Sequence, residues 1–250
     1  MKILSWNVNG LRAVHKKGFL SWLENCNADI ICLQETKAQL EQFPNDLLKV
    51  ANYQLYSNSA IKKGYAGVAV YTKQKPEKVE YKLGLGRFDQ EGRIIKLTYS
   101  EFILFNFYLP HGGRQKENLD YKLEVYDTIF KIIDKIKDKN IILAGDFNIA
   151  HEEIDLANPK QNKNNIMFTE NERKQISKLI KMGFIDSFRK FNSETGNYTW
   201  WPYAFNARER NLGWRIDYIF TSRSIEANLK FAFILNKINL SDHCPIGIEF

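Results

Sequence analysis

The chain has few cysteines, few prolines and no long hydrophobic run. Its three cysteines, Cys26, Cys32 and Cys244, are odd in number and lack the spacing of a zinc site, which fits a reducing compartment. No apolar stretch is long enough for a transmembrane helix or a signal peptide, so we expect a cytoplasmic protein. No linker, repeat or low-complexity tract interrupts residues 1–250, which predicts a single domain.

Glycine-rich phosphate loops of the GxGxxG or GxxxxGK type are also absent, which argues against nucleotide-triphosphate chemistry. The hydrophobic fraction of 44% and the charged fraction of 26% are ordinary for a globular protein. The net charge of +7 is less ordinary. It has two interpretations that composition alone leaves open: a charge that keeps the protein in solution, or a positive surface for a polyanionic partner such as nucleic acid.

Several short apolar runs end in residues that can hold a metal, a proton or a phosphate. Runs this short and this apolar are typical of strands that are buried on both faces. The polar residues at or beside their ends are Asn7, Glu35, Tyr108, Asp146, Asn148, Asp217, Asp242 and His243. A set of polar strand ends predicts one cleft at which these strands converge, as ligand sites do in layered α/β folds.

The order of the runs favours a mixed sheet over a purely parallel one. The strands expected at 94–98 and 102–108 are separated by a short turn, which indicates antiparallel pairing. We therefore expect two mixed sheets packed face to face, with helices outside. A long helix is expected to be capped by Asp120, and Thr169 with Glu172 resembles the capping box of another.

Glu35 is a candidate metal ligand because a carboxylate at the end of a buried strand needs a cationic partner. One interpretation is a salt bridge to Lys37 or to an arginine. The other is a hard divalent cation such as Mg²⁺, which takes one or two carboxylates and leaves its other positions to water and phosphate. Asn7 and Asp242 are expected to complete such a site.

Two further pairs suggest proton transfer. In Asp146-Phe147-Asn148, strand alternation would put the carboxylate and the amide on one side, where they could accept a proton from water and orient that water. The alternative is an Asx turn after a strand. Asp217 could fix the tautomer of His243 and stabilise its protonated form beside a phosphate, although the spacing does not prove that the two touch.

Two other segments have a composition suited to DNA. Residues 198–210 interleave aromatic side chains with Arg208 and Arg210, and residues 158–165 are almost all amide and ammonium. Trp200 and Trp201 are interpreted either as core or as residues that stack on bases, with the arginines on phosphates. The amide-rich segment is either a solvated loop or a loop that grips phosphates.

Together these motifs resemble the exonuclease III family, the class II apurinic/apyrimidinic endonucleases. The motifs are Trp6–Ala13, Leu33–Lys37, Gly145–Asn148, Gly213–Tyr218 and Ser241–Pro245, in the order of the family. The resemblance implies a four-layer α/β sandwich of two mixed sheets. It also implies Mg²⁺-dependent hydrolysis, with Mn²⁺ as an alternative ion, of double-stranded DNA on the 5′ side of an abasic site. The product ends would be a 3′-hydroxyl and a 5′-deoxyribose phosphate.

The resemblance also implies roles for individual residues. Tyr108, Asp146, Asn148, Asp217 and His243 match the catalytic positions, and Glu35, Asn7 and Asp242 match the metal site. The substrate-binding positions are matched by Arg114, Asn162, Asn165, Trp200, Ala204, Trp214 and Ile216. A DNA-repair role, 3′-exonuclease or 3′-phosphodiesterase activity, a monomeric state and no membrane partner are the corresponding expectations.

Three positions depart from the family pattern. Asn9 stands where some members carry an aspartate near the metal, which leaves Glu35 as the principal carboxylate ligand. His111 replaces an Asn or Gln, and Ala204 replaces a larger side chain that enters the duplex. Two rival functions remain: another phosphodiesterase, such as a nonspecific nuclease or a lipid phosphatase, and a nucleic-acid-binding protein without turnover.

Overall fold

The strands of the computed structural model, which describes residues 1–250, pair into two sheets of six. The first sheet has the order β11-β12-β1-β2-β4-β3 and the second β5-β6-β7-β8-β10-β9. The first contains β1 (Lys2–Asn7), β2 (Ile30–Gln34), β3 (Gln54–Asn58), β4 (Val68–Thr72), β11 (Phe231–Ile234) and β12 (Ile246–Glu249). The second contains β5 (Lys78–Glu80), β6 (Ile94–Thr98), β7 (Ile103–Tyr108), β8 (Ile141–Asp146), β9 (Phe184–Asp186) and β10 (Asp217–Ser222).

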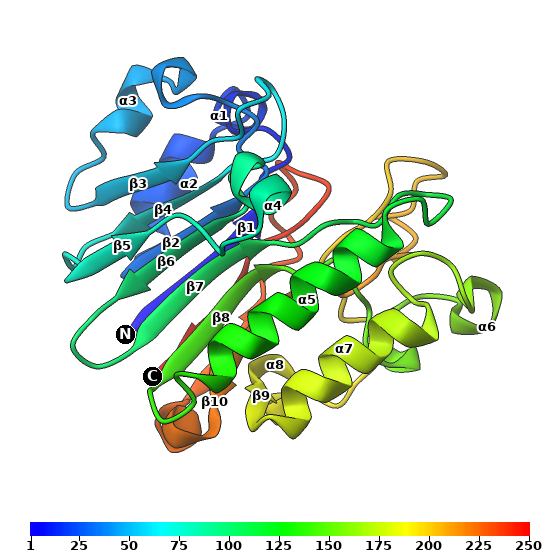
Figure 1. Ribbon diagram of the computed structural model, residues 1–250. Helices are drawn as coiled ribbons and strands as arrows, with labels where there is room; N and C mark the ends of the chain where they lie inside the picture. Colours follow the sequence, from blue (N-terminus) through cyan, green and yellow to red (C-terminus); the bar gives the residue numbers. More distant parts are fainter.

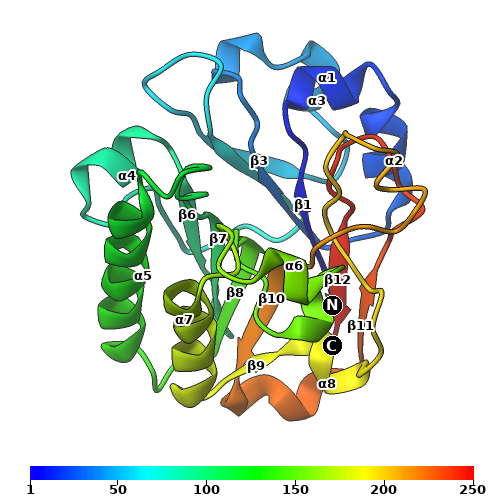
Figure 2. The same cartoon turned by 90° about the vertical axis from the view of Figure 1, so that its right-hand side faces the viewer.

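Helices cover the outer faces of both sheets. Figure 2 shows α1, α2 and α3 on one side of the molecule and α5 and α7 on the other. The α-helices are α1 (Leu11–His15), α2 (Phe19–Asn25), α3 (Asn45–Leu48), α4 (Gly86–Gln90), α5 (Leu119–Asp134), α6 (Pro159–Asn162), α7 (Glu170–Lys181) and α8 (Ser187–Phe191). Short 3₁₀ helices are η1 (Leu40–Gln42), η2 (Glu153–Asp155) and η3 (Arg223–Asn228). None of the helices is long and apolar enough to cross a membrane.

Three apolar clusters hold these layers together. One joins the first sheet to α1, α2 and α3, a second lies between the sheets, and a third joins the second sheet to α5 and α7. The central strands β1, β2, β8 and β10 are almost entirely buried because apolar layers cover both of their faces. The expected four-layer α/β sandwich of two mixed sheets is confirmed (Figure 1).

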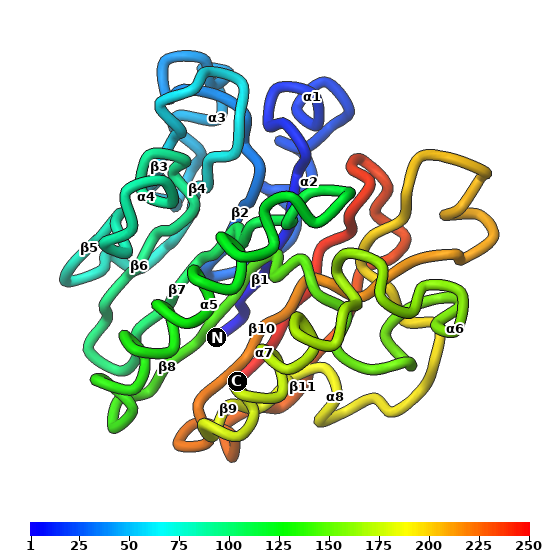
Figure 3. The backbone as a smooth tube through the Cα atoms, turned by 45° about the vertical axis from the view of Figure 1, so that its right-hand side comes forward, coloured from blue at the N-terminus to red at the C-terminus, as the bar shows by residue number.

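Strand pairing brings the polar strand ends to one edge of the sandwich. β1 runs parallel to β2, so that Asn7 pairs with Gln34, and β7 runs parallel to β8, so that Tyr108 pairs with Asp146. β6 and β7 pair antiparallel, as the short turn predicted. Figure 3 shows the two chain ends close together, and because β1 starts there, Asn7 lies at the opposite edge.

Gly145 allows β8 to approach β7 just before this edge. Its φ angle is +143°, and a Cβ atom added to it would lie 1.9 Å from the carbonyl oxygen of Phe107. Any other residue would therefore push the two strands apart one position before Asp146. Gly145 is therefore required for the Asp146 carboxylate to occupy its observed position.

Of the two predicted helix starts, one is confirmed and one is wrong. Thr169 caps α7, and its side chain and that of Glu172 form the expected capping box. Asp120, in contrast, does not cap α5, because the N-cap is Asn118 and Asp120 lies in the first turn. A negative charge is favourable there as well, since it faces the positive end of the helix dipole.

Candidate active site

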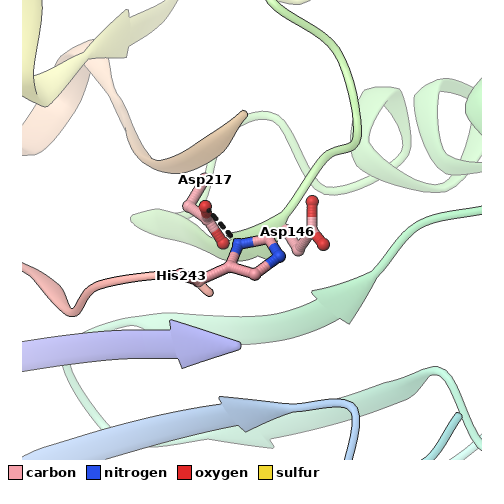
Figure 4. A group of neighbouring side chains, drawn as sticks. All are labelled: Asp146, Asp217 and His243. Carbon is pink, nitrogen blue, oxygen red and sulfur yellow. Dashed lines mark hydrogen bonds and ion pairs between the residues drawn. The ribbon is translucent and has the colours of Figure 1, made fainter. Parts of the chain in front are cut away.

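Two carboxylates and one imidazole meet where β8, β10 and the loop before β12 come together (Figure 4). Asp217 begins β10 directly opposite Asp146, the last residue of β8. His243 donates from Nδ1 to Asp217 Oδ2 over 2.9 Å. One ligand atom from each of the three side chains lies within 4.8 Å of the other two, and all three residues are buried. The structure thus brings together Asp146, Asp217 and His243, three of the residues that the motifs singled out.

Burial and neighbouring charges adjust the pKa of each group. Removal from water raises the pKa of Asp146 to about 7, and the negative charge of Asp217 acts in the same direction. Burial acts to lower the pKa of His243, but the Asp217 carboxylate outweighs it and the pKa rises to about 10. At neutral pH, therefore, His243 carries a proton and Asp146 is divided between acid and carboxylate. Asp146 can therefore accept a proton, and the protonated His243 can stabilise an anion beside it.

Asp146 is held by two amides. Asn7 Nδ2 donates to its Oδ2 over 2.9 Å, and the backbone N–H of Asn148 donates to its Oδ1 over 2.8 Å. The second contact is an Asx turn, and the φ angle of Asn148 is +51°. Of the two interpretations of this segment, the Asx turn is therefore correct and the strand alternation is wrong. The chain leaves the extended conformation after Asp146, and the turn places the backbone N–H of Asn148 beside the carboxylate. Asn148 Nδ2 donates to the carbonyl of Leu109 over 2.9 Å.

Glu35 lies in a polar network that also contains a cation. Its carboxylate accepts a hydrogen bond from the Tyr108 hydroxyl and lies 2.7 Å from the ammonium of Lys37. The Lys37 ammonium also donates to Asn9 Oδ1, and Asn9 Nδ2 donates to Asp242 Oδ1 over 2.9 Å. The salt-bridge interpretation of Glu35 is therefore correct. Oxygens of Glu35 and Asn9 thus lie around one positive charge, the Lys37 ammonium. Carboxylate and amide oxygens are also the ligands that a hard divalent cation prefers.

Asn7 and Asp242 lie on either side of Asn9. Asn7 Oδ1 accepts from the backbone N–H of Asn9 over 2.9 Å, while its amide group faces Asp146. Asp242 Oδ2 accepts from Trp200 Nε1 over 3.1 Å. Asp242 and Glu35 are therefore joined through Asn9 and Lys37, whereas Asn7 connects this network to Asp146.

A cavity of about 470 Å³ adjoins the buried cluster. Its lining includes four of the predicted substrate-binding residues, Arg114, Asn165, Trp200 and Trp214, together with His111 and Met167. The rings of Trp200 and His243 lie 6.3 Å apart, so Trp200 belongs to the cavity and also borders the cluster. The aromatic walls and the cationic side chain of Arg114 suit a ligand with an apolar ring and a negative charge.

Three predicted substrate-binding residues do not line this cavity. Ile216 is buried and packs in the apolar cluster against which Trp200 and Trp214 lie. Asn162 accepts a hydrogen bond from Asn165 Nδ2 over 3.0 Å, so it supports a cavity residue. Ala204 is exposed on the loop that follows Trp200.

Sequence reasoning missed two residues that hold predicted site residues in place, Thr199 beside Asp217 and Arg93 beside Tyr108. Thr199 Oγ1 donates to Asp217 Oδ2 over 2.6 Å and accepts from the backbone N–H groups of Ile216 and Asp217. The guanidinium of Arg93 lies 4.4 Å from the ring of Tyr108 and donates to its carbonyl over 3.1 Å. Arg93 directly precedes the apolar strand β6, where the sequence could have indicated a buried charge, but nothing in the sequence connects Thr199 with Asp217.

Comparison with known proteins places this geometry in a family. A profile of the Endonuclease/Exonuclease/phosphatase family matches residues 4–243. The chain is 45% identical to an exodeoxyribonuclease of Bacillus subtilis (strain 168), over 99% of this chain and 98% of that protein. It is 40% identical to a DNA-(apurinic or apyrimidinic site) endonuclease of Dictyostelium discoideum, over 99% of this chain and 70% of that protein.

A solved structure agrees with these relatives. The structure of an AP endonuclease from Archaeoglobus fulgidus superposes with a TM-score of 0.91 at 30% identity, covering 100% of this chain and 99% of the other. The fold, the profile match and the relatives all lead to one assignment: the chain belongs to the endonuclease/exonuclease/phosphatase family.

Proposed function

We propose that this protein is a metal-dependent DNA-repair endonuclease that hydrolyses the phosphodiester on the 5′ side of an abasic site and leaves a 3′-hydroxyl. The observation that carries the proposal is the contact between a buried Asp146–Asp217–His243 cluster and a cavity walled by Trp200 and Trp214. The relatives named as an exodeoxyribonuclease and an apurinic endonuclease support a nuclease that acts on DNA.

Asp146 is the group that accepts a proton from the attacking water. Its pKa of about 7 means that a substantial fraction is ionised at neutral pH and can act as a general base. The hydrogen bonds from Asn7 and Asn148 fix its two oxygens, so the carboxylate does not have to be oriented during the reaction. Asn148 is the amide that helps to orient the water.

His243 stabilises the negative charge that develops on the phosphate. Its pKa of about 10 keeps the imidazole protonated at neutral pH, and Asp217 holds the ring through Nδ1. A fixed cation in a buried site stabilises such charge more strongly than a cation in water does. Tyr108 remains protonated because burial, and next the charge of Glu35, raise its pKa well above its usual range, and it contributes a hydroxyl donor.

Glu35 is the principal metal ligand, with Asn7 and Asp242 beside it. The oxygens of Glu35 and Asn9 already share the Lys37 ammonium, so they fit a cation that prefers oxygen donors, such as Mg²⁺ or Mn²⁺. A bound ion of this kind supplies Lewis-acid polarisation of a phosphate oxygen. The Asp146–Asp217–His243 group is also close enough to hold a metal. However, a protonated His243 that commits Nδ1 to Asp217 is better suited to stabilising negative charge.

The cavity is the site for the sugar that has lost its base. An abasic nucleotide has no base to unstack, so turning it out of the duplex costs less than turning out an intact nucleotide. Arg114 and Asn165 on the cavity wall would contact the DNA, and the net charge of +7 favours a polyanion in general. We further infer a monomer in the cytoplasm, associated with the nucleoid if the organism is prokaryotic. A 3′-exonuclease or 3′-phosphodiesterase activity is expected at the same site.

A nicking assay tests the proposal. The wild-type protein is incubated with a duplex that carries one abasic analogue, with the same duplex intact, with RNA and with an inositol phospholipid. Mg²⁺ is present in one series and EDTA in the other. We expect a single nick 5′ to the abasic analogue that disappears in EDTA.

Equal cleavage of both duplexes would indicate a nonspecific nuclease. Phosphate release from the lipid without nicking would indicate a lipid phosphatase, and binding without cleavage would indicate a protein without turnover.

A further inference from the structure

An ion pair between Lys122 and Glu172 is completely buried beneath the candidate active site. Both side chains have 0% exposure, and the ammonium lies 2.6 Å from Glu172 Oε1. The two residues come from α5 and α7, which lie side by side in Figures 1 and 2. Neither residue belongs to the catalytic cluster, and neither lines the cavity.

The pair contacts three loops that form the site. Lys122 Nζ donates to the carbonyl of Asn148 over 2.7 Å and to the carbonyl of His111 over 3.1 Å. Glu172 Oε1 accepts from the backbone N–H of Met167 over 3.0 Å. Asn148 follows Asp146 in the turn after β8, whereas His111 and Met167 line the cavity. One pair of charges is therefore bound to both the catalytic turn and the cavity wall.

The backbone around this pair has little freedom to move. Asn148 has a φ angle of +51°, a conformation that non-glycine residues seldom adopt, and its carbonyl accepts from the ammonium in that conformation. Gly112 has a φ angle of +97°, and a Cβ atom on it would lie 2.8 Å from Ile166 Cδ1 and 3.4 Å from Lys122 Cδ. The loops therefore pack directly against the lysine side chain.

Stability alone is a weak reason for such a pair. Moving two charges out of water costs free energy that their attraction often fails to recover, and well-packed apolar replacements are frequently as stable. An ammonium has three donors, however, and here they all have partners, namely two loop carbonyls and one carboxylate. An apolar side chain could fill the same space but could not hold these two carbonyls in place.

We propose that Lys122 and Glu172 are positioning residues of the active site, which fix the turn of Asn148 and the adjoining cavity wall in the geometry required for hydrolysis. The proposal rests on the proposed function for its substrate. It concerns the position of the Asn148 turn and of the cavity wall, and it involves no contact of Lys122 with DNA. The pair would act through Asn148, whose backbone N–H holds Asp146.

The first test separates positioning from stability. Lys122→Met leaves the Glu172 carboxylate buried without its cation, so we expect a lower melting temperature. We also expect kcat on the abasic duplex to fall on the order of 100-fold, the loss that a displacement of about 1 Å in an active site causes. In the double variant Lys122→Met/Glu172→Gln no unpaired charge remains. Much of the melting temperature should therefore return, while kcat stays low, because both carbonyls still lack their donor.

The control is Leu47→Ala, a cavity variant in the core beneath the other sheet. It should lower the melting temperature while leaving kcat unchanged at a temperature where all variants are folded. DNA binding in EDTA, measured by fluorescence anisotropy, should change less than about threefold in the Lys122 variants, because Lys122 is buried and is not proposed to contact DNA. A threefold change in affinity corresponds to less than about 1 kcal/mol. Recovery of kcat together with stability in the double variant would overturn the proposal.

A double-mutant cycle with Asp146→Asn provides the second test. If Lys122 acts on Asp146 through the backbone of Asn148, Lys122→Met should reduce kcat much less in the Asp146→Asn background than in the wild type. Equal fold-losses in both backgrounds would mean that the two residues act independently, which contradicts the proposal. If the wild type cleaves only intact duplex from its 3′ end, the proposed substrate is wrong. The same variants then test the positioning on that reaction.

Discussion

The surrounding structure controls the charge of Asp146 through several neighbouring groups. Asp217 stands directly opposite it in the antiparallel pair, and two like charges in that arrangement repel each other. His243 offsets the repulsion by carrying a proton that it shares with Asp217, and the two amides on Asp146 favour its ionised form. The result is a carboxylate that can gain or lose a proton near neutral pH, as a general base must.

Asp146→Asn should therefore abolish the base while keeping the shape of the side chain. We expect the single-turnover rate on an abasic duplex to fall by about 10²- to 10⁴-fold, the usual contribution of a general base. Binding of that duplex in EDTA should change little. Asp134→Asn is the matched control, because Asp134 is 65% exposed at the end of α5 and should have no effect. An unchanged rate in Asp146→Asn would refute the assigned role.

Glu35→Gln tests the metal site by removing one negative charge with little change in size. Because the carboxylate is the main ligand proposed for a divalent cation, the Mg²⁺ concentration for half-maximal activity should rise by about tenfold or more. Direct calorimetric titration with Mg²⁺ in the absence of DNA should show the same weakening. Glu170→Gln, at a 77% exposed position, is the control. Identical Mg²⁺ titrations for wild type and Glu35→Gln would place the ion elsewhere.

At the scale of elements, the strands could be predicted because their burial is so complete. Runs such as Ile141–Asp146 are apolar on both faces, which distinguishes them from exposed turns without knowledge of the fold. Conformations set by a single hydrogen bond were harder to predict. For Asn148 the sequence leaves an extended strand and an Asx turn open, and the structure shows that its backbone N–H turns back to Asp146. Asp120 was expected to cap α5, but Asn118, two residues earlier, occupies that position.

The capping box of α7 links an element to the site, because Glu172 belongs both to the cap and to the buried ion pair. Thr169→Ala removes the side-chain oxygen that accepts from the backbone N–H of Glu172, so we expect a loss of about 1 kcal/mol in the free energy of unfolding. Urea titration followed by circular dichroism measures it. Thr195→Ala in an exposed loop is the control, and a loss no greater than in that control would contradict the role of the cap.

At the scale of the whole molecule, the site depends on contacts between distant parts of the chain. Motifs in the sequence identified Asp146, Asp217 and His243, since these residues carry chemistry at strand ends. The network around Glu35 could not be derived in the same way. Asn9 reaches Asp242 across 233 residues of sequence. Only the packing of both sheets determines such a contact, so a sequence pattern that extends over a few residues contains no signal of it.

A second buried network of charges links Arg215, which lies just before β10, to η2, β9 and α8, and it predicts how the stability of the protein changes in acid. Arg215 donates to Asp155 Oδ1 over 2.8 Å and to Asp186 Oδ2 over 2.7 Å, and Arg189 donates to the same Asp155 oxygen over 2.6 Å. Burial acts to raise the pKa of Asp155, but the two guanidinium groups outweigh it and hold the pKa at about 2. Asp155 is thus ionised in the folded protein at pH values where the unfolded chain begins to be protonated.

A carboxylate whose pKa is lower in the folded than in the unfolded state stabilises the fold above its unfolded pKa, near 4, and this contribution disappears as the pH falls through about 2. Asp155→Asn should therefore destabilise the protein by a constant amount from neutral pH down to about 4. Below that pH the difference from wild type should shrink by about 2 kcal/mol. Urea unfolding at a series of pH values measures this difference, with exposed Asp134→Asn as the control. A difference that stayed constant between pH 4 and pH 2 would mean that the arginines do not hold Asp155 ionised, and that β10 is anchored by packing instead of by this charge.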